Sequence, residues 1–174
     1  MSDFAHRVSV DRIRDGDRLD IVASEEERAG VAARLGLPAV ARLEAHVTLR
    51  RDGRAVCCEG RVRAQLEQAC VASGEPVPAA IDEPFSIRFV PAPEAGAAEE
   101  EIELGEGELD TVFYDGAAVD LGDAIADTVG LALDPYPRSP NADEALREAG
   151  VMSEAEAGPF AALAKLKRGG AGEA

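Results

Sequence analysis

The sequence of 174 residues predicts one α+β domain, a twisted antiparallel sheet with flanking helices and an acidic loop. Three observations predict it. Residues Leu43 to Leu49 alternate apolar and polar side chains, which is typical of a half-buried strand. An Asp-Gly pair follows and indicates a tight hairpin turn. Two segments with capping residues, one before and one after the central strands in the sequence, predict flanking helices. A barrel-like closure of the sheet is left open.

The first ninety residues are expected to begin with two short strands, over residues 4–10 and 19–22. A helix should start at Ser24, because its hydroxyl and the Glu27 side chain form the two halves of a capping box. Gly36 is expected to end this helix in the left-handed conformation that glycine adopts easily.

The register of the central hairpin follows from its turn. If Asp52-Gly53 is the two-residue loop, residues whose numbers sum to 105 lie opposite each other. Apolar side chains then meet apolar ones on one face. On the other face His46 would meet Glu59, and Glu44 would meet Arg61.

The elements after this hairpin are expected from turn residues, caps and periodicity. In order they are a hairpin strand ending near Val71, a strand ending at Pro91, an acidic loop over residues 92–108, a strand over residues 109–114, a helix from Asp120 and a helical tail over residues 141–168. Asn141 is expected to cap the first helix of that tail together with Glu144.

Charge excludes some classes of protein. The net charge of -16 is wrong for a protein that coats nucleic acid with surplus Lys and Arg. The charge is unevenly placed, with 19 acidic and 5 basic residues after position 90 and a near-neutral, arginine-bearing part before it. No apolar stretch approaches the ~20 residues of a membrane-spanning helix. Three cysteines and no signal-peptide pattern at the N-terminus favour a cytoplasmic location.

Four arginines are expected on the polar face of the hairpin, and guanidinium groups bind phosphates through paired hydrogen bonds. They are Arg42, Arg50, Arg61 and Arg63. No aromatic residues lie between them to stack on bases, so sequence-specific reading of single strands is not expected. RNA contact, a solvated face and a face covered by the acidic half of the chain are the open alternatives.

The acidic loop gives a second candidate surface. It contains seven glutamates and no basic residue. Glu99, Glu100 and Glu101 could bind a cationic partner, such as the Arg- and Lys-rich tail of a ribosomal protein. The alternative function within the binding class is therefore an acidic, chaperone-like escort for a basic ribosomal protein, bound by these glutamates and the helix Asp120 to Leu133. A solvated linker is the alternative use of such a segment.

A thiol enzyme is the runner-up from another class. In the expected register Cys57 is diagonal to His46, and Glu59 could orient the imidazole, as thiol catalysis requires. An open sheet face offers neither a cleft nor oxyanion donors, so no catalytic residue is assigned. Cys58 and Cys70 fall at the same alternating strand positions as the buried aliphatic residues, so they are expected to be small buried hydrophobes.

Several segments, in order, resemble the YceD family, which is named for large ribosomal RNA subunit accumulation. They are Glu59 to Val71, Gly74 to Val77, Val119 to Leu121, Leu131 to Pro137 and Pro159 to Leu166. The family positions within them are Gly60, Cys70, Glu75, Pro76 and Asp120. The resemblance implies a cytoplasmic, non-enzymatic bacterial protein needed for accumulation of large-subunit ribosomal RNA. That RNA or a basic ribosomal protein is the implied partner, with no membrane, DNA or cofactor.

Two departures from the family pattern concern metal binding. Many members have a Cys-x-Arg-Cys motif where this chain has Cys70-Val71-Ala72-Ser73, and some have a cysteine-rich segment where it has residues 135–140. Zinc requires several thiolate or imidazole ligands at one centre, so no zinc is expected.

Overall fold

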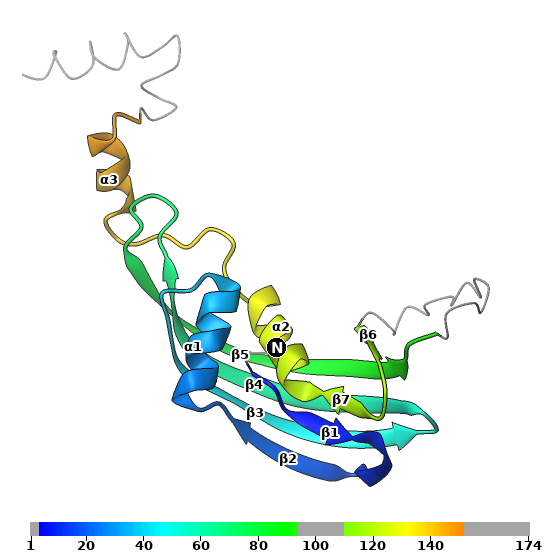
Figure 1. Cartoon of the computed structure of the whole chain (residues 1–174). Helices are drawn as coiled ribbons and strands as arrows, with labels where there is room; N and C mark the ends of the chain where they lie inside the picture. The colour runs from blue at the N-terminus through cyan, green and yellow to red at the C-terminus, as the bar shows by residue number, and fades with distance from the viewer. Residues whose placement is uncertain (1–3, 94–109, 152–174) are drawn as a thin grey trace, which may run out of the picture. The chain divides into compact units, whose positions relative to one another are not determined.

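The computed structural model describes residues 4–93 and 110–151 (Figure 1). The chain divides into two compact units. The first contains the chain up to Gln68 and residues Pro78–Pro135, and the second contains Ala69–Val77 and the chain from Tyr136 onward. Each unit is described by itself below.

The described strands form two sheets. Their bounds are β1 Arg7–Ser9, β2 Asp17–Val22, β3 Ala39–Asp52, β4 Ala55–Ala69, β5 Pro76–Pro91, β6 Thr111–Tyr114 and β7 Ala118–Asp120. Strands β1 and β7 form an antiparallel pair, and the other five form a sheet in the order β2-β3-β4-β5-β6. This sheet is open, so the barrel-like form is not adopted. The mixed α+β class with flanking helices is confirmed, but β6 pairs with β5 in parallel, whereas a fully antiparallel sheet was expected.

The helices of the first unit cover one face of the five-stranded sheet. They are α1 Glu25–Leu35 and α2 Leu121–Leu131, and Figure 1 shows both on the same side. Alternate residues of β3 and β4 point toward them and are buried. The core includes Val31, Leu43, Leu49, Val56, Val62, Phe89, Leu121 and Ile125. The intervening residues point to the opposite face, which we call the outer face.

The register of the β3–β4 hairpin differs from the expected one. Asp52 pairs with Ala55, so the two-residue loop is Gly53-Arg54, and Leu49 lies opposite Cys58 rather than Val56. The reason is backbone conformation. A loop of Asp52-Gly53 in a type I′ turn would need a positive φ at an aspartate, whereas Gly53 takes φ 61° as the first loop residue. The shift is two residues along the partner strand, so the same side chains still face the core.

Helix caps were predicted well, with one exception. Ser24 Oγ accepts a hydrogen bond from the Glu27 amide, and Glu27 Oε2 accepts one from the Ser24 amide at 2.7 Å. Gly36 ends α1 in the left-handed region at φ 65°. Asn141 precedes α3 (Ala142–Glu148), but its side chain makes no capping hydrogen bond and donates instead to Glu75 at 3.4 Å. Asn141 has φ -89° and ψ 1°, so it lacks the extended backbone that a capping residue usually adopts.

Some predicted elements fall outside the described residues. Nearly all of the acidic loop lies in residues 94–109, and the tail beyond residue 151 is likewise not described. Within the described ranges, no helix is both long and apolar enough to cross a lipid bilayer.

Candidate binding surfaces

The outer face carries all four arginines that the sequence singled out. Arg42 and Arg50 come from β3, Arg61 and Arg63 come from β4, and every one is exposed. The strand period places them on one face because all four occupy positions that alternate with buried residues. The acidic helix α2 packs against the other face of the sheet.

Carboxylates of the same face pair with these arginines. Arg61 Nη1 donates to Asp82 Oδ1 at 2.7 Å, and Arg63 Nε lies 3.4 Å from Asp82 Oδ2. These contacts lower the pKa of Asp82 and raise that of Arg61, because each charge stabilises the ionised form of the other. Arg42 donates to Glu44 Oε2 at 2.7 Å. Positive and negative side chains therefore alternate across the outer face and pair with each other.

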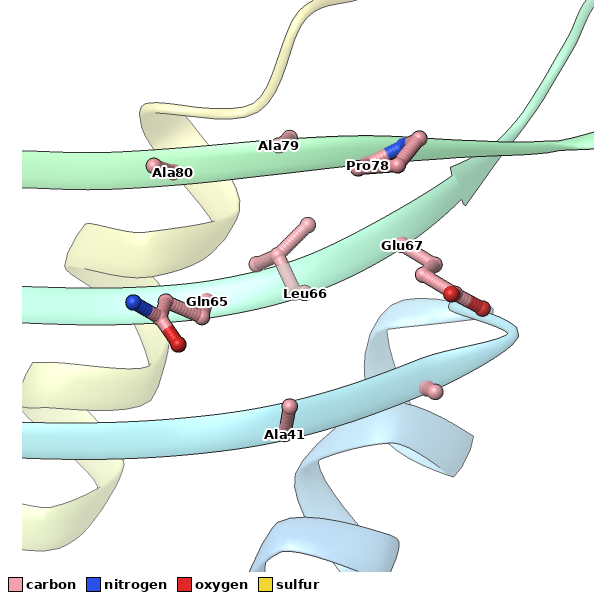
Figure 2. Close-up of a pocket in the computed structure, with 8 residues that line it drawn as sticks. Ala41, Gln65, Leu66, Glu67, Pro78, Ala79 and Ala80 are labelled. Atoms are coloured by element: carbon pink, nitrogen blue, oxygen red, sulfur yellow. The ribbon is translucent and has the colours of Figure 1, made fainter.

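A shallow depression lies at one end of the outer face (Figure 2). Its volume is about 430 Å³, and small side chains from three neighbouring strands line most of it. The lining residues are Ala39 and Ala41 of β3, Gln65, Leu66 and Glu67 of β4, and Pro78, Ala79 and Ala80 of β5. A second depression of about 180 Å³ shares Gln65 and Ala80 with it and reaches Arg42 and Arg63. Small residues at outward positions on neighbouring strands were the sequence signal for this feature, and it was missed.

The structure does not assemble the thiol–imidazole–carboxylate arrangement. In the observed register Cys57 lies opposite Arg50, and His46 lies opposite Arg61. His46 Nδ1 is 2.5 Å from Asp20 of β2, so its carboxylate partner is not Glu59. The hypothesis failed because a register shift of two residues separates side chains that were expected to be diagonal neighbours.

Cys58 and Cys70 are both buried, as predicted, but only Cys58 behaves as a simple hydrophobe. Burial raises the pKa of Cys58 to about 12. In the second unit, Cys70 Sγ accepts hydrogen bonds from the amides of Ser139 at 3.2 Å and Ser73 at 3.5 Å. These donors stabilise the thiolate and lower the pKa of Cys70 to about 6.

Glu75 completes this cluster. Its Oε2 accepts hydrogen bonds from the hydroxyls of Ser139 at 2.8 Å and Ser73 at 3.2 Å, and its Oε1 accepts one from Asn141. The pKa of Glu75 is lowered for that reason, with the Ser139 hydroxyl as the largest cause. The cluster ties the connection between β4 and β5 to the segment before α3. No group of three or more His, Cys, Asp or Glu side chains among the described residues is arranged to hold a metal ion.

The structure explains why glycine and aspartate occupy two other family positions, Gly60 and Asp120. A Cβ at Gly60 would lie 2.3 Å from the His46 carbonyl oxygen and 2.9 Å from Phe85 Cζ, so only glycine fits there. Asp120 Oδ1 accepts hydrogen bonds from the Gly122 and His6 amides, each at 3.0 Å. It caps α2 and fixes the chain that enters β1.

Residues 58–167, more than half of the chain, match the family described as large ribosomal RNA subunit accumulation protein YceD. The chain belongs to the YceD family. Comparisons with curated proteins and with solved structures gave no match. The YceD match includes Arg61, Arg63 and the Cys70 cluster, whereas Arg42 and Arg50 lie before it. The family description links the chain to accumulation of large-subunit ribosomal RNA and names no reaction.

Proposed function

We propose that this YceD-family chain supports accumulation of large-subunit ribosomal RNA as a non-enzymatic binding factor whose outer face contacts RNA phosphates. The observation that carries the proposal is the arrangement of Arg61 and Arg63. They stand two residues apart on β4, point the same way and share one acceptor, Asp82.

The exposed ion pairs of the outer face can be exchanged for phosphate contacts at low cost. The side chains of Arg61, Arg63 and Asp82 are each about half exposed, at 48%, 51% and 53%. Such pairs contribute only about 0–1 kcal/mol in water. A guanidinium has several N–H donors in a fixed fork, and the contacts to Asp82 use one nitrogen of each arginine. The remaining donors of both forks are available to a phosphate.

Charge balance sets the character of this contact. Glu44, Glu59 and Asp82 share the outer face with the arginines, so long-range attraction for RNA is weak there. Binding then depends on short-range, paired hydrogen bonds. The larger depression adjoins the smaller one that Arg42 and Arg63 line, and it gives a mostly apolar floor on which a ribose or an unstacked base could rest near a held phosphate.

Retention of the purified full-length protein on large-subunit ribosomal RNA tests the proposal. Changing Arg61→Ala together with Arg63→Ala should weaken retention by about tenfold. It should also lower the dependence of retention on salt, because the variant makes fewer phosphate contacts and binding then releases fewer counterions. Arg12→Ala with Arg14→Ala is the matched control, since both arginines are exposed and lie outside the outer-face strands. Equal retention of the Arg61/Arg63 variant and this control would exclude the outer face as the RNA contact.

A further inference from the structure

A second surface of the first unit has the opposite chemistry. A groove of about 680 Å³ lies against β6 and α2. Phe113 and Val112 of β6 line it while remaining 55% and 40% exposed. Large apolar side chains that stay exposed beside a cavity are typical of an interaction site.

Carboxylates surround this apolar patch. Asp115, Asp123 and Asp127 line the groove, and Arg7 is the basic residue among the lining residues. Asp123 and Asp127 are one helical turn apart on α2, and both bind a single guanidinium, that of Arg34, at 2.8 and 2.6 Å. Their spacing therefore already suits an arginine. Their side chains are still 43% and 62% exposed, so they can approach further cations.

The negative charge of the groove indicates which class of molecule can bind there. RNA is a polyanion, a second copy of the chain carries a net charge of -16, and residues 94–109 contain seven glutamates without a basic residue. All three would be repelled by the aspartates of the groove. A cationic chain with apolar stems is attracted by the aspartates and can also stack a guanidinium on Phe113.

We infer that the β6–α2 groove binds an Arg- and Lys-rich polypeptide segment of a partner protein. This surface is separate from the outer face, so the inference goes beyond the proposed RNA contact and does not depend on it.

Fluorescence anisotropy with a labelled synthetic peptide of alternating Arg, Lys and Leu tests this inference on the full-length protein. Phe113→Ala should weaken binding by about fivefold, since an exposed aromatic contact is removed without touching the core. Asp123→Asn with Asp127→Asn should weaken it by about tenfold and reduce its salt dependence. A peptide with Glu in place of Arg and Lys should not bind.

The control variant is Glu25→Gln with Glu26→Gln, which removes the same charge from exposed positions at the start of α1. It should bind the basic peptide as the unchanged protein does. If it weakens binding as much as the aspartate variant, the peptide is held by net charge alone and the groove is excluded. Unchanged binding by Phe113→Ala would also overturn the inference, and this variant leaves the Arg34 ion pairs intact.

Two further outcomes separate other occupants. Residues Lys165, Lys167 and Arg168 of this chain are basic and lie among apolar residues. If the peptide binds only after all three are changed to Ala, the chain's own tail occupies the groove and the partner inference fails. Direct binding of a labelled RNA oligonucleotide to the protein that is weakened by Phe113→Ala would likewise overturn it. Arg61→Ala with Arg63→Ala should leave peptide binding unchanged, which keeps this test distinct from that of the outer face.

Discussion

The backbone amide of Ser139 donates a hydrogen bond to Cys70 Sγ at 3.2 Å, joining residues that are 69 positions apart. The Ser73 amide is a second donor to the same sulfur. Backbone N–H groups favour a thiolate over a thiol because their dipoles point at the negative charge. They lower the pKa of Cys70 from 9.0 to about 6 in the folded chain. The thiolate is then the main form at neutral pH.

This relationship predicts a pH-dependent contribution of Cys70 to stability. Because the folded pKa is depressed, the contribution is fully present above the unfolded value of 9.0 and is lost as pH falls through about 6. The difference in stability between the unchanged protein and Cys70→Ala should therefore grow as pH rises from 6 to 9. Urea unfolding across this range measures the difference.

Thiolate absorbance in the ultraviolet provides an independent measurement. It should rise with a midpoint near pH 6 that disappears in Cys70→Ala. Cys58→Ala is the control, because Cys58 ionises only near pH 12 and its removal should leave that midpoint in place. A Cys70 midpoint near 9 would contradict the assigned hydrogen bonds.

Close backbone packing around α2 predicts contrasting effects of two glycine substitutions in the same helix. A Cβ at Gly122 would lie 1.9 Å from the Phe4 carbonyl oxygen, whereas one at Gly130 would lie 3.1 Å from Leu35 Cδ2, the end of a side chain. Gly122→Ala should cost about 1–3 kcal/mol or more of unfolding free energy, because backbone atoms must move. Gly130→Ala should stay within about 1 kcal/mol of the unchanged protein, since alanine favours the helix and Leu35 can shift.

Urea unfolding of both variants measures this contrast. Equal losses from the two substitutions would show that the Phe4 backbone does not pack against α2 as described. Gly130→Ala is the matched control for helix propensity, because both positions lie within α2.

Asp120 both caps α2 and holds the chain that enters β1, so its replacement should lower the free energy of unfolding. The size of the decrease should depend on whether an acceptor oxygen is kept. Asp120→Ala removes the acceptor of the Gly122 and His6 amides, and loss of a helix cap alone costs about 0.5–2 kcal/mol. Asp120→Asn keeps an acceptor oxygen and should retain most of the stability. Thermal unfolding of the two variants compares them. A loss in Asp120→Asn as large as that in Asp120→Ala would assign the effect to charge and not to capping.

Side-chain parity explains how much of this fold could be predicted from the sequence. Alternation along β3 and β4 correctly placed the four arginines on one face, because the strand period does not depend on which residues pair. The register did depend on the turn, where Gly53 takes the positive φ as the first loop residue. The hypothesis that joined Cys57 to His46 therefore failed together with the register.

Contacts between distant segments were beyond the sequence patterns. Parity correctly predicted that Cys70 is buried, but no local pattern indicates that an amide from Ser139 reaches its sulfur. The same holds for the groove, where β6 and α2 bring Phe113 and Asp127 together only in the folded chain. Capping was more predictable because it involves residues within one helical turn, as Ser24 and Glu27 show.

The position of Asp82 between two arginines predicts that its removal strengthens RNA binding. Asp82→Asn removes the charge that holds Arg61 and Arg63, so both guanidinium groups become available to phosphates. Retention on large-subunit ribosomal RNA should increase by about threefold to tenfold at low salt. The midpoint of urea unfolding should stay close to that of the unchanged protein, because these ion pairs are exposed.

A double-variant comparison decides whether this gain acts through the arginines. Asp82→Asn should have no effect on RNA retention when Arg61 and Arg63 are already alanine, because the carboxylate then restrains no phosphate-binding group. Glu83→Gln is the charge control, since it removes the neighbouring carboxylate on β5 without breaking the contacts of Asp82. A gain that persists without the two arginines, or that Glu83→Gln reproduces in full, would reflect the reduced negative charge of the whole chain. Only a gain that requires both arginines assigns the RNA contact to the outer face.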